Sequence, residues 1–282
     1  MIRRPVISRR QFLAAFGVAT GGSAMAGCDA FTWARERVRI SRHDVAIAGL
    51  PMGLRGLTIA HLTDIHFYDG MDRGARRAME HVAGIAPDLT VLTGDYVESA
   101  AQLDQLGPFL QACRGSLGTV VTIGNWEHQL SISPSEIRRI VERAGAVFLF
   151  NETHLVRRGD ATLAIVGLDD PCAGAPSPER ALPDVPSGAT TIWAFHAPGY
   201  ADLLSADRYP RPDFMLAGHT HGGQIRLPLV PAITPVASGR FVAGWYRDTF
   251  APLYVSRGIG TTSIRARFRC SPEIAVFSLR PA

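Results

Sequence analysis

Residues of the kinds that bind metal ions follow the ends of five apolar runs along the chain. The runs LTIAHL, DLTVLT, TVVTI, TTIWAF and DFMLA are short and end at a Gly or a polar residue, a pattern typical of buried parallel strands. Side chains at the carboxyl ends of such strands converge on one crevice. They comprise two carboxylates, one amide and four imidazoles, namely Asp64, His66, Asp95, Asn125, His196, His219 and His221. These are too many ligands for one ion and suit two ions that share a carboxylate.

The order and wording of these motifs resemble the calcineurin-like metallophosphoesterase superfamily, whose pattern is D-x-H, G-D, G-N-x-[ED], H and G-H-x-H. The resemblance covers roughly residues 55–280, and the last part, from GHTHGGQIRLP to SPEIAVFSL, is similar to the branch of YkuE- and YaeI-type phosphodiesterases. It implies an α/β fold, a four-layer αββα sandwich of two mixed sheets flanked by helices. It also implies a dinuclear metal centre and hydrolysis of phosphoesters.

The resemblance assigns a role to each residue of the motifs. Asp95 is expected to bridge two divalent ions, and the remaining ligands divide into Asp64, His66 and His221 for one ion and Asn125, His196 and His219 for the other. Nitrogen and oxygen ligands fit Mn, Fe, Zn or Ni, and the sequence leaves the metal open. Taken singly, a Gly-Asp pair is usually a turn and a lone His is usually structural. The ordered set favours the metal site.

The third motif departs from the family pattern. It reads Gly-Asn-Trp-Glu, so Trp126 stands where most of the superfamily has a His that helps to protonate the leaving group. An indole donates one hydrogen bond but cannot act as an acid. Either His128 takes over this role, or the substrate departs without proton assistance, or Trp126 only packs the loop. The candidate catalytic residues are therefore Asp95, Asn125 and His128.

The first 30 residues read as an export signal. The pair Arg9-Arg10 precedes an uncharged, Ala- and Gly-rich stretch over residues 12–27, which predicts transport of the folded protein by the twin-arginine (Tat) translocon. Cys28 follows a sequence that resembles a lipoprotein cleavage box, so lipidation, plain cleavage and an uncleaved anchor stay open. Each alternative predicts a periplasmic or membrane-associated protein.

Charge and cysteine content restrict the partners. The net charge is +4 and the pI is near 9.1, and part of it comes from Arg257, Arg265, Arg267 and Arg269 near the end of the chain. Such basic character suits an anionic substrate or an anionic lipid surface. No basic run with interleaved aromatic residues indicates nucleic-acid binding. Apart from Cys28, three widely spaced cysteines remain, which are expected to be buried thiols.

The rest of the chain divides into a linker and one domain. Residues 31–53 are expected to be a linker with an edge strand, and residues 54–282 the metallophosphoesterase domain. Within it we expect a helix in MDRGARRAMEHVAGIA, a second over about 101–113 and a third that begins at a Ser133 capping box. The segment THLVRRGDATLAIVG predicts a hairpin that turns at Gly159-Asp160. The stretch 171–189 is expected to be a surface loop, and the last third mostly strands.

These expectations favour a dinuclear metal-dependent phosphoesterase. Its substrate is predicted to be a phosphodiester or a pyrophosphate, because phosphate leaving groups need little protonation. Some members of the resembled branch act on UDP-2,3-diacylglucosamine in lipid A biosynthesis, so this lipid-linked nucleotide sugar is the leading named candidate. A twin-arginine leader disfavours it, because the nucleotide sugar is cytoplasmic, unless the leader stays as an anchor on the inner side of the membrane. The alternative is a catalytically silent, metal-stabilised binding lipoprotein. A phosphate-binding module of the Rossmann type is excluded, because no G-x-G-x-x-G motif follows a strand.

Overall fold

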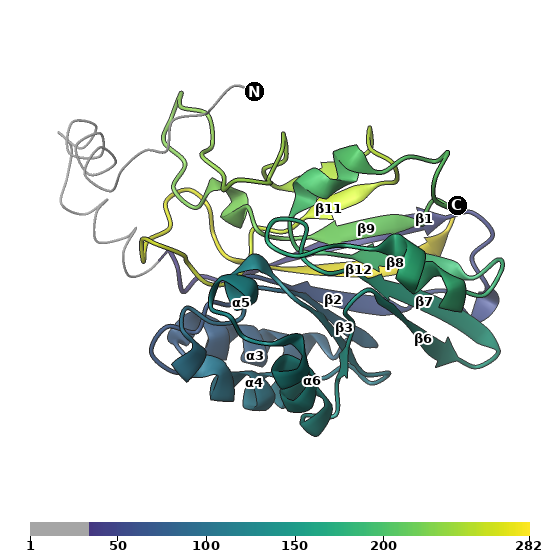
Figure 1. The fold of residues 1–282 in the computed structure, drawn as a ribbon, viewed down its shortest axis with the longest axis horizontal. Coiled ribbons are helices and arrows are strands. Elements are labelled where there is room, and N and C mark those ends of the chain that lie inside the picture. The colour runs from purple at the N-terminus through teal and green to yellow at the C-terminus, as the bar shows by residue number, and fades with distance from the viewer. Residues whose placement is uncertain (1–33) are drawn as a thin grey trace.

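Two six-stranded sheets pack face to face in the computed structural model, which describes residues 34–282 (Figure 1). The first sheet has the order β1 (Arg39–Ile47), β12 (Glu273–Pro281), β2 (Thr58–Leu62), β3 (Leu89–Thr93), β4 (Thr119–Thr122) and β5 (Val147–Phe148). The second has the order β10 (Gly244–Tyr246), β11 (Leu253–Val255), β9 (Phe214–Ala217), β8 (Thr190–Ala194), β7 (Ala161–Gly167) and β6 (Glu152–Arg158). The predicted leader and Cys28 lie outside the described residues.

Both sheets are mixed. Strands β2 to β5 run parallel, whereas β12 is antiparallel to β2 and parallel to β1. In the second sheet, β7, β8, β9 and β11 are parallel, and the antiparallel strands β6 and β10 form its edges. The segment predicted as a linker thus contributes β1, which is an edge strand as expected.

Helices cover the outer face of the first sheet. They are α3 (Arg73–Ile85), α4 (Leu106–Ala112) and α6 (Pro134–Arg143), preceded in the case of α4 by the 3-10 helix η3 (Ala100–Gln105). Figure 1 shows all three below this sheet. They bury residues such as Ala78, Phe109 and Ile137 against it. The Ser133 hydroxyl accepts a hydrogen bond from the Glu136 amide, 3.2 Å, so the cap predicted for α6 is confirmed.

The outer face of the second sheet is covered by short elements. These are α7 (Pro178–Ala181) and the 3-10 helices η4 (Leu182–Asp184) and η5 (Pro198–Leu203), together with long loops. Trp193, Phe195 and Phe241 are buried beneath them. The stretch 171–189, predicted as a loop, therefore contains two short helices, because Pro178 and Ala181 are buried on this sheet. The four-layer αββα architecture is confirmed, with a thinner fourth layer.

A central core lies between the two sheets. It includes Ile59 and Val91 from the first sheet and Ile165 and Ile192 from the second, all fully buried. The hairpin predicted around Gly159-Asp160 is confirmed by the antiparallel pairing of β6 with β7. The remaining helices are η2 (Met52–Leu54), α5 (Asn125–Gln129) and η6 (His221–Gly223). Within residues 34–282 no helix combines the length and apolar character needed to cross a membrane.

Candidate metal centre

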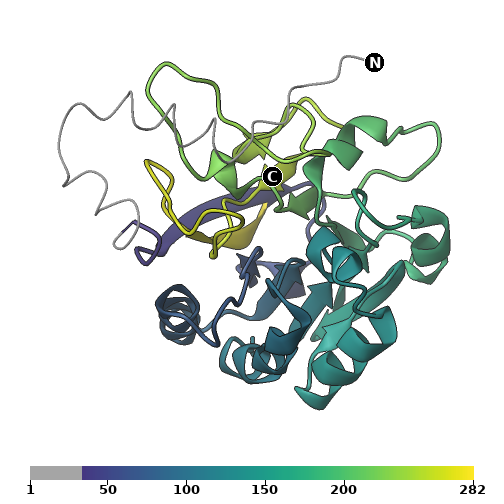
Figure 2. The ribbon, with the colours of Figure 1, turned by 60° about the vertical axis from the view of Figure 1, so that its left-hand side comes forward.

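The seven residues of the motifs meet at the carboxyl ends of five strands. Asp64 and His66 follow β2, Asp95 follows β3, and Asn125 begins the short helix α5 after β4. In the other sheet His196 follows β8, and His219 and His221 follow β9. All seven are at most 6% exposed. Figure 2 views the molecule after a turn of 60°, and the two sheets can be followed there with the loops that leave their ends.

Left-handed backbone conformation directs most of these side chains. The φ angles lie between 49° and 69° at five of the seven residues, namely Asp64, His66, Asp95, His219 and His221. Residues other than Gly rarely adopt this conformation, and where they do it is often at a functional site. Period-two alternation at a strand end would also point Asp64 and His66 the same way, but β2 ends at Leu62. The two side chains therefore converge because the backbone turns at each of them.

The first group consists of Asp64, His66 and His221. The Nε2 atom of His221 lies 3.4 Å from Asp64 Oδ1 and 3.2 Å from His66 Nε2. One ligand atom from each residue lies within 4.8 Å of the others. A carboxylate oxygen and two ring nitrogens at such distances make a donor set suited to a divalent ion of the transition series.

The second group consists of Asp95, His196 and His219, again within 4.8 Å of one another. His196 Nε2 lies 3.1 Å from Asp95 Oδ2, and His219 Nδ1 lies 2.8 Å from the Asn125 amide oxygen. The same Asp95 Oδ2 lies 3.6 Å from His66 Nε2, a member of the first group. Asp95 is thus the carboxylate located between the two groups.

Acceptors outside the centre hold the second nitrogen of three imidazoles. His66 Nδ1 lies 2.9 Å from Glu98 Oε1, His196 Nδ1 is 2.6 Å from the Thr93 carbonyl oxygen, and His219 Nε2 is 2.7 Å from that of Val236. The hydrogen bonds of His196 and His219 fix their tautomers, so the other nitrogen of each ring keeps its lone pair for a metal. Sequence reasoning missed Glu98, because nothing in the motif pattern marks a carboxylate three residues beyond Asp95.

The charges of the centre favour cations. Burial alone would lower the pKa of His196, but the carboxylates of Asp95 and Asp64 raise it well above its usual value. Burial would raise the pKa of Asp95, yet His196 and His66 lower it. The pKa of His221 falls well below its usual value because of burial and of the neighbouring His66 and Arg267. The carboxylates thus attract positive charge to the centre, and a metal ion bound there would compete with protons for the same imidazoles.

Two glycines allow the loops to approach one another. Gly94 has φ of 83°, and a Cβ on it would lie 2.5 Å from the Cα of Gly124. No larger residue fits this contact without moving the backbone. The close approach brings the Asp95 loop against the start of α5, where the Trp126 amide donates a 2.9 Å hydrogen bond to Asp95 Oδ1.

Glu127 holds these loops together. Its fully buried carboxylate accepts hydrogen bonds from the amides of Asp95, Tyr96 and Gly124, at 3.0, 2.7 and 2.9 Å. The acidic fourth position of the G-N-x-[ED] motif thus has a structural task here. It ties the loop that carries Asp95 to the loop that carries Asn125.

Glu127→Ala is therefore expected to destabilise the fold strongly. It would leave three buried amides without an acceptor, at about 1–3 kcal/mol for each. Urea unfolding would measure the loss, with Glu127→Gln as an intermediate case, because its amide oxygen can still accept. Glu80→Ala, on the exposed face of α3, is the control and should change the free energy of unfolding by at most about 0.5 kcal/mol. Equal stability of Glu127→Ala and this control would contradict the structural role.

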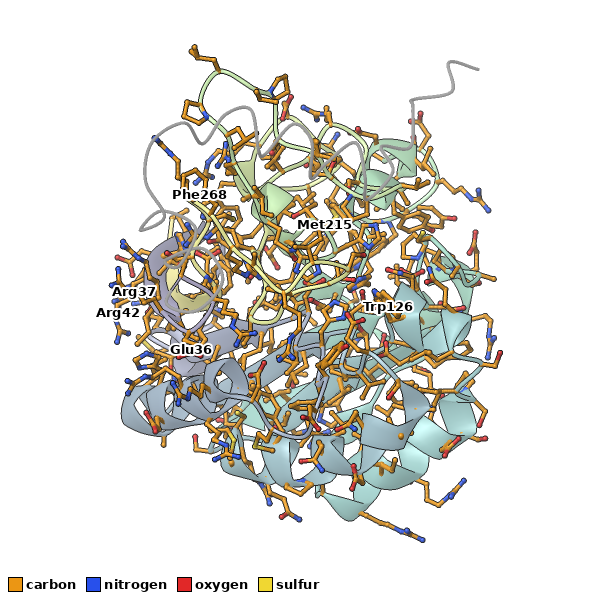
Figure 3. All side chains as sticks on the ribbon, turned by 90° about the vertical axis from the view of Figure 1, so that its left-hand side faces the viewer. Glu36, Arg37, Arg42, Trp126, Met215 and Phe268 are labelled. Carbon is orange, nitrogen blue, oxygen red and sulfur yellow. The ribbon has the colours of Figure 1, made fainter. Side chains whose placement is uncertain are left out.

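Trp126 and His128, the two alternatives in the third motif, have different surroundings. The Trp126 indole stands edge-on against the His66 ring, with centroids 5.7 Å apart, and Figure 3 shows it on the side of the molecule that faces the viewer. His128 Nε2 lies 2.7 Å from Asp169 Oδ1. That hydrogen bond raises the pKa of His128. The His128 imidazole of α5 is thus hydrogen-bonded to Asp169, which follows β7.

His61 and the cysteines of residues 34–282 belong to neither of the two groups, although the Cys270 thiol donates to the His221 carbonyl oxygen at 3.2 Å. His61 is fully buried and contacts the Thr93 hydroxyl at 2.8 Å, and burial lowers its pKa to about 4, so it is a neutral core residue. Cys113 and Cys270 are buried free thiols as expected, whereas Cys172 is only half-buried.

Comparison with known proteins agrees with this geometry. The family model described as calcineurin-like phosphoesterase matches residues 57–223. The chain is 29% identical to the uncharacterized metallophosphoesterase YkuE of Bacillus subtilis over 97% of its own length and 98% of that protein's. It is also 29% identical to the phosphodiesterase YaeI of Escherichia coli, over 68% of this chain and 70% of YaeI.

A third relative has a more specific name. The chain is 27% identical to the UDP-2,3-diacylglucosamine pyrophosphatase LpxG of Chlamydia muridarum, over 79% of this chain and 83% of that protein. The family model covers more than half of the chain, and the matched segment contains all seven residues of the two groups. The chain therefore belongs to the calcineurin-like phosphoesterase family and is a metal-dependent phosphoester hydrolase.

Proposed function

We propose that the protein hydrolyses a phosphodiester or pyrophosphate bond with two divalent ions. Asp64, His66 and His221 would hold one ion and Asn125, His196 and His219 the other, with Asp95 shared. The observation that carries this proposal is the place of Asp95 Oδ2, 3.1 Å from His196 Nε2 and 3.6 Å from His66 Nε2. One carboxylate within reach of both groups is the arrangement that a dinuclear site requires.

When bound, a pair of ions activates water as a nucleophile and neutralises phosphate oxygens. The residues of the chain orient the reacting groups. The Trp126 amide holds one oxygen of Asp95 and leaves the other directed at the imidazoles. Asn125 adds a neutral oxygen beside His219, so the second group carries less negative charge than two carboxylates would give.

The choice of substrate rests on the third motif. Trp126 offers no ionisable proton, which favours substrates whose leaving group is already a weak base, such as an aryl alcohol or a phosphate. His128 is the candidate proton donor, since its contact with Asp169 favours the protonated imidazole. A leaving-group series on His128→Ala decides between these two accounts.

A lipid-linked substrate is the finer proposal. It is supported by the similarity to LpxG, whose name gives UDP-2,3-diacylglucosamine as its substrate. That nucleotide sugar is the leading named candidate if the leader stays as an anchor on the inner side of the membrane. The substrate class that we propose is therefore a lipid that carries a pyrophosphate or phosphodiester bond.

A hydrolysis screen with defined metals tests the proposal. The protein would be stripped of metal and reloaded separately with Mn, Fe, Zn or Ni, then offered an aryl phosphodiester, a nucleoside diphosphate sugar and an alkyl phosphomonoester. Turnover of one of the first two with two bound ions per chain supports the proposal. Two bound ions without turnover of any ester would instead support the alternative, a metal-stabilised binding lipoprotein.

We also propose export by the twin-arginine route, on the sequence of residues 1–30. Replacing Arg9 and Arg10 by Lys is expected to retain the precursor in the cytoplasm, because this translocon reads the arginine pair. Cell fractionation measures the distribution, and fatty-acid labelling of wild type against Cys28→Ser reports lipidation separately. A wild-type protein that stays in the cytoplasm would show that the leader has been misread.

A further inference from the structure

Two loops beside the metal centre form one surface. The first follows β9 and η6, and the second precedes β12. The Arg226 amide donates to the Phe268 carbonyl oxygen at 2.9 Å, and the Phe268 amide donates to that of Gln224 at 3.0 Å. The Gln224 side chain adds hydrogen bonds to the carbonyl oxygens of Thr262 and Ile264. We call residues 224–238 and 261–269 the loop surface. Figure 3 labels Phe268 on it, in the same view as Trp126.

The tip of the loop surface is apolar and exposed. Residues 34–282 have eight large, exposed apolar side chains, and four of them lie in the eight residues 229–236. They are Leu229, Val230, Ile233 and Val236, which are 105%, 50%, 53% and 82% exposed. Single exposed apolar residues are ordinary, but a cluster of this kind marks a binding surface.

Around this tip the charge is positive. The loop surface contains four arginines, of which only Arg267 is buried, and no acidic residue. Arg240 pairs with Asp248 and Asp202. Within the part of the chain that the structure describes, Arg226, Arg265 and Arg269 form no ion pair. Their charges therefore remain available to an anionic partner.

The loop surface is continuous with the metal centre on two sides. The Val236 carbonyl oxygen accepts from His219 Nε2 at 2.7 Å. Tyr68, two residues beyond His66 and 52% exposed, lies under the guanidinium of Arg265 at 4.2 Å from its ring centroid. A substrate with its phosphate at the centre would thus have its remainder close to the loop surface.

We propose that the loop surface docks on an anionic lipid bilayer. Leu229, Val230 and Ile233 would enter the boundary between headgroups and acyl chains, and Arg226, Arg265 and Arg269 would contact lipid phosphates. An apolar tip within a basic rim free of acidic residues matches this partner, since bilayer surfaces combine apolar depth with negative charge. The inference deepens the proposed function, because docking would bring a lipid-linked phosphoester to the metal centre.

Vesicle flotation of the full chain tests the docking. Vesicles of phosphatidylcholine mixed with phosphatidylglycerol are compared with vesicles of phosphatidylcholine alone, and every variant keeps the same leader, so that its contribution cancels. Leu229→Ser with Ile233→Ser is expected to lower partitioning at least about tenfold, because the two side chains lose their apolar burial. Arg226→Gln with Arg269→Gln is expected to lose roughly tenfold or more on the anionic vesicles alone.

Met52→Ser is the matched control, because Met52 is 75% exposed and lies in η2, before β2 and so at the opposite end of that strand from Asp64. It should partition like wild type. Equal partitioning of all these proteins would overturn the docking surface, and so would self-association that Leu229→Ser abolishes in the absence of lipid. Turnover of a soluble diester by wild type without vesicles reports the proposed function separately, so the two failures are distinguishable.

Discussion

Asp95→Asn is expected to lower the rate of phosphoester hydrolysis by on the order of a thousandfold, which corresponds to about 4 kcal/mol of transition-state stabilisation. The amide keeps the shape of the side chain and an oxygen that can accept from the Trp126 amide. It removes the negative charge located between His196 and His66. Both groups should therefore bind metal more weakly, which metal analysis of the purified variant measures beside kcat/KM.

Asn125→Ala is the matched comparison for this variant. Asn125 contacts His219, in the second group alone, so its loss should leave the first group loaded and cost less activity. If Asp95→Asn retains two ions and normal turnover, Asp95 does not bridge the centre. A loss confined to one ion in both variants would equally contradict the shared carboxylate.

The rate of the wild-type protein is expected to fall steeply as the pKa of the leaving group rises. Trp126 provides no acid, and a positioned general acid contributes about a hundred- to ten-thousandfold. Aryl phosphodiesters and pyrophosphates should thus be cleaved far faster than alkyl phosphomonoesters. Trp126→His should flatten the dependence, since it restores an imidazole beside His66, where the indole now packs. Turnover over a series of leaving groups measures the slope.

The variant His128→Ala tests the other possibility, that His128 protonates the leaving group. If His128 is the acid, the wild-type slope is shallow and becomes steep in this variant. Because the contact with Asp169 raises the pKa of His128, an acid role would then hold activity up to a higher pH than an ordinary imidazole allows, and Asp169→Asn would move that limit to lower pH. A steep wild-type slope, unchanged in His128→Ala, assigns His128 to structure alone.

Most of the first sheet and its helices could be predicted from local pattern. The run LTIAHL contains β2, the segment MDRGARRAMEHVAGIA contains α3, and the Ser133 cap begins α6. Each of these depends on apolar periodicity or on a cap, which are properties of neighbouring residues. The convergence of the seven motif residues followed from parallel strands ending at one edge.

Other features depend on contacts between distant segments. Glu98 becomes a neighbour of His66 only because the segments after β2 and β3 run side by side, with a bridge between Phe67 and Val97. The left-handed turns at Asp64 and Asp95 occur at residues other than Gly, so composition does not reveal them. The short helices of residues 171–189 form because the second sheet offers them an apolar face. Local periodicity in the sequence does not predict these helices.

The place of β12 has a consequence for synthesis. This last strand lies between β1 and β2, pairing with nine residues of the former and four of the latter. Residues through Ser278 must therefore leave the ribosome before β2, the strand that leads to Asp64, is flanked on both sides. Since pairing over such sequence distance forms late, the strand that leads to Asp64 is expected to gain its second neighbour only in a late step of folding.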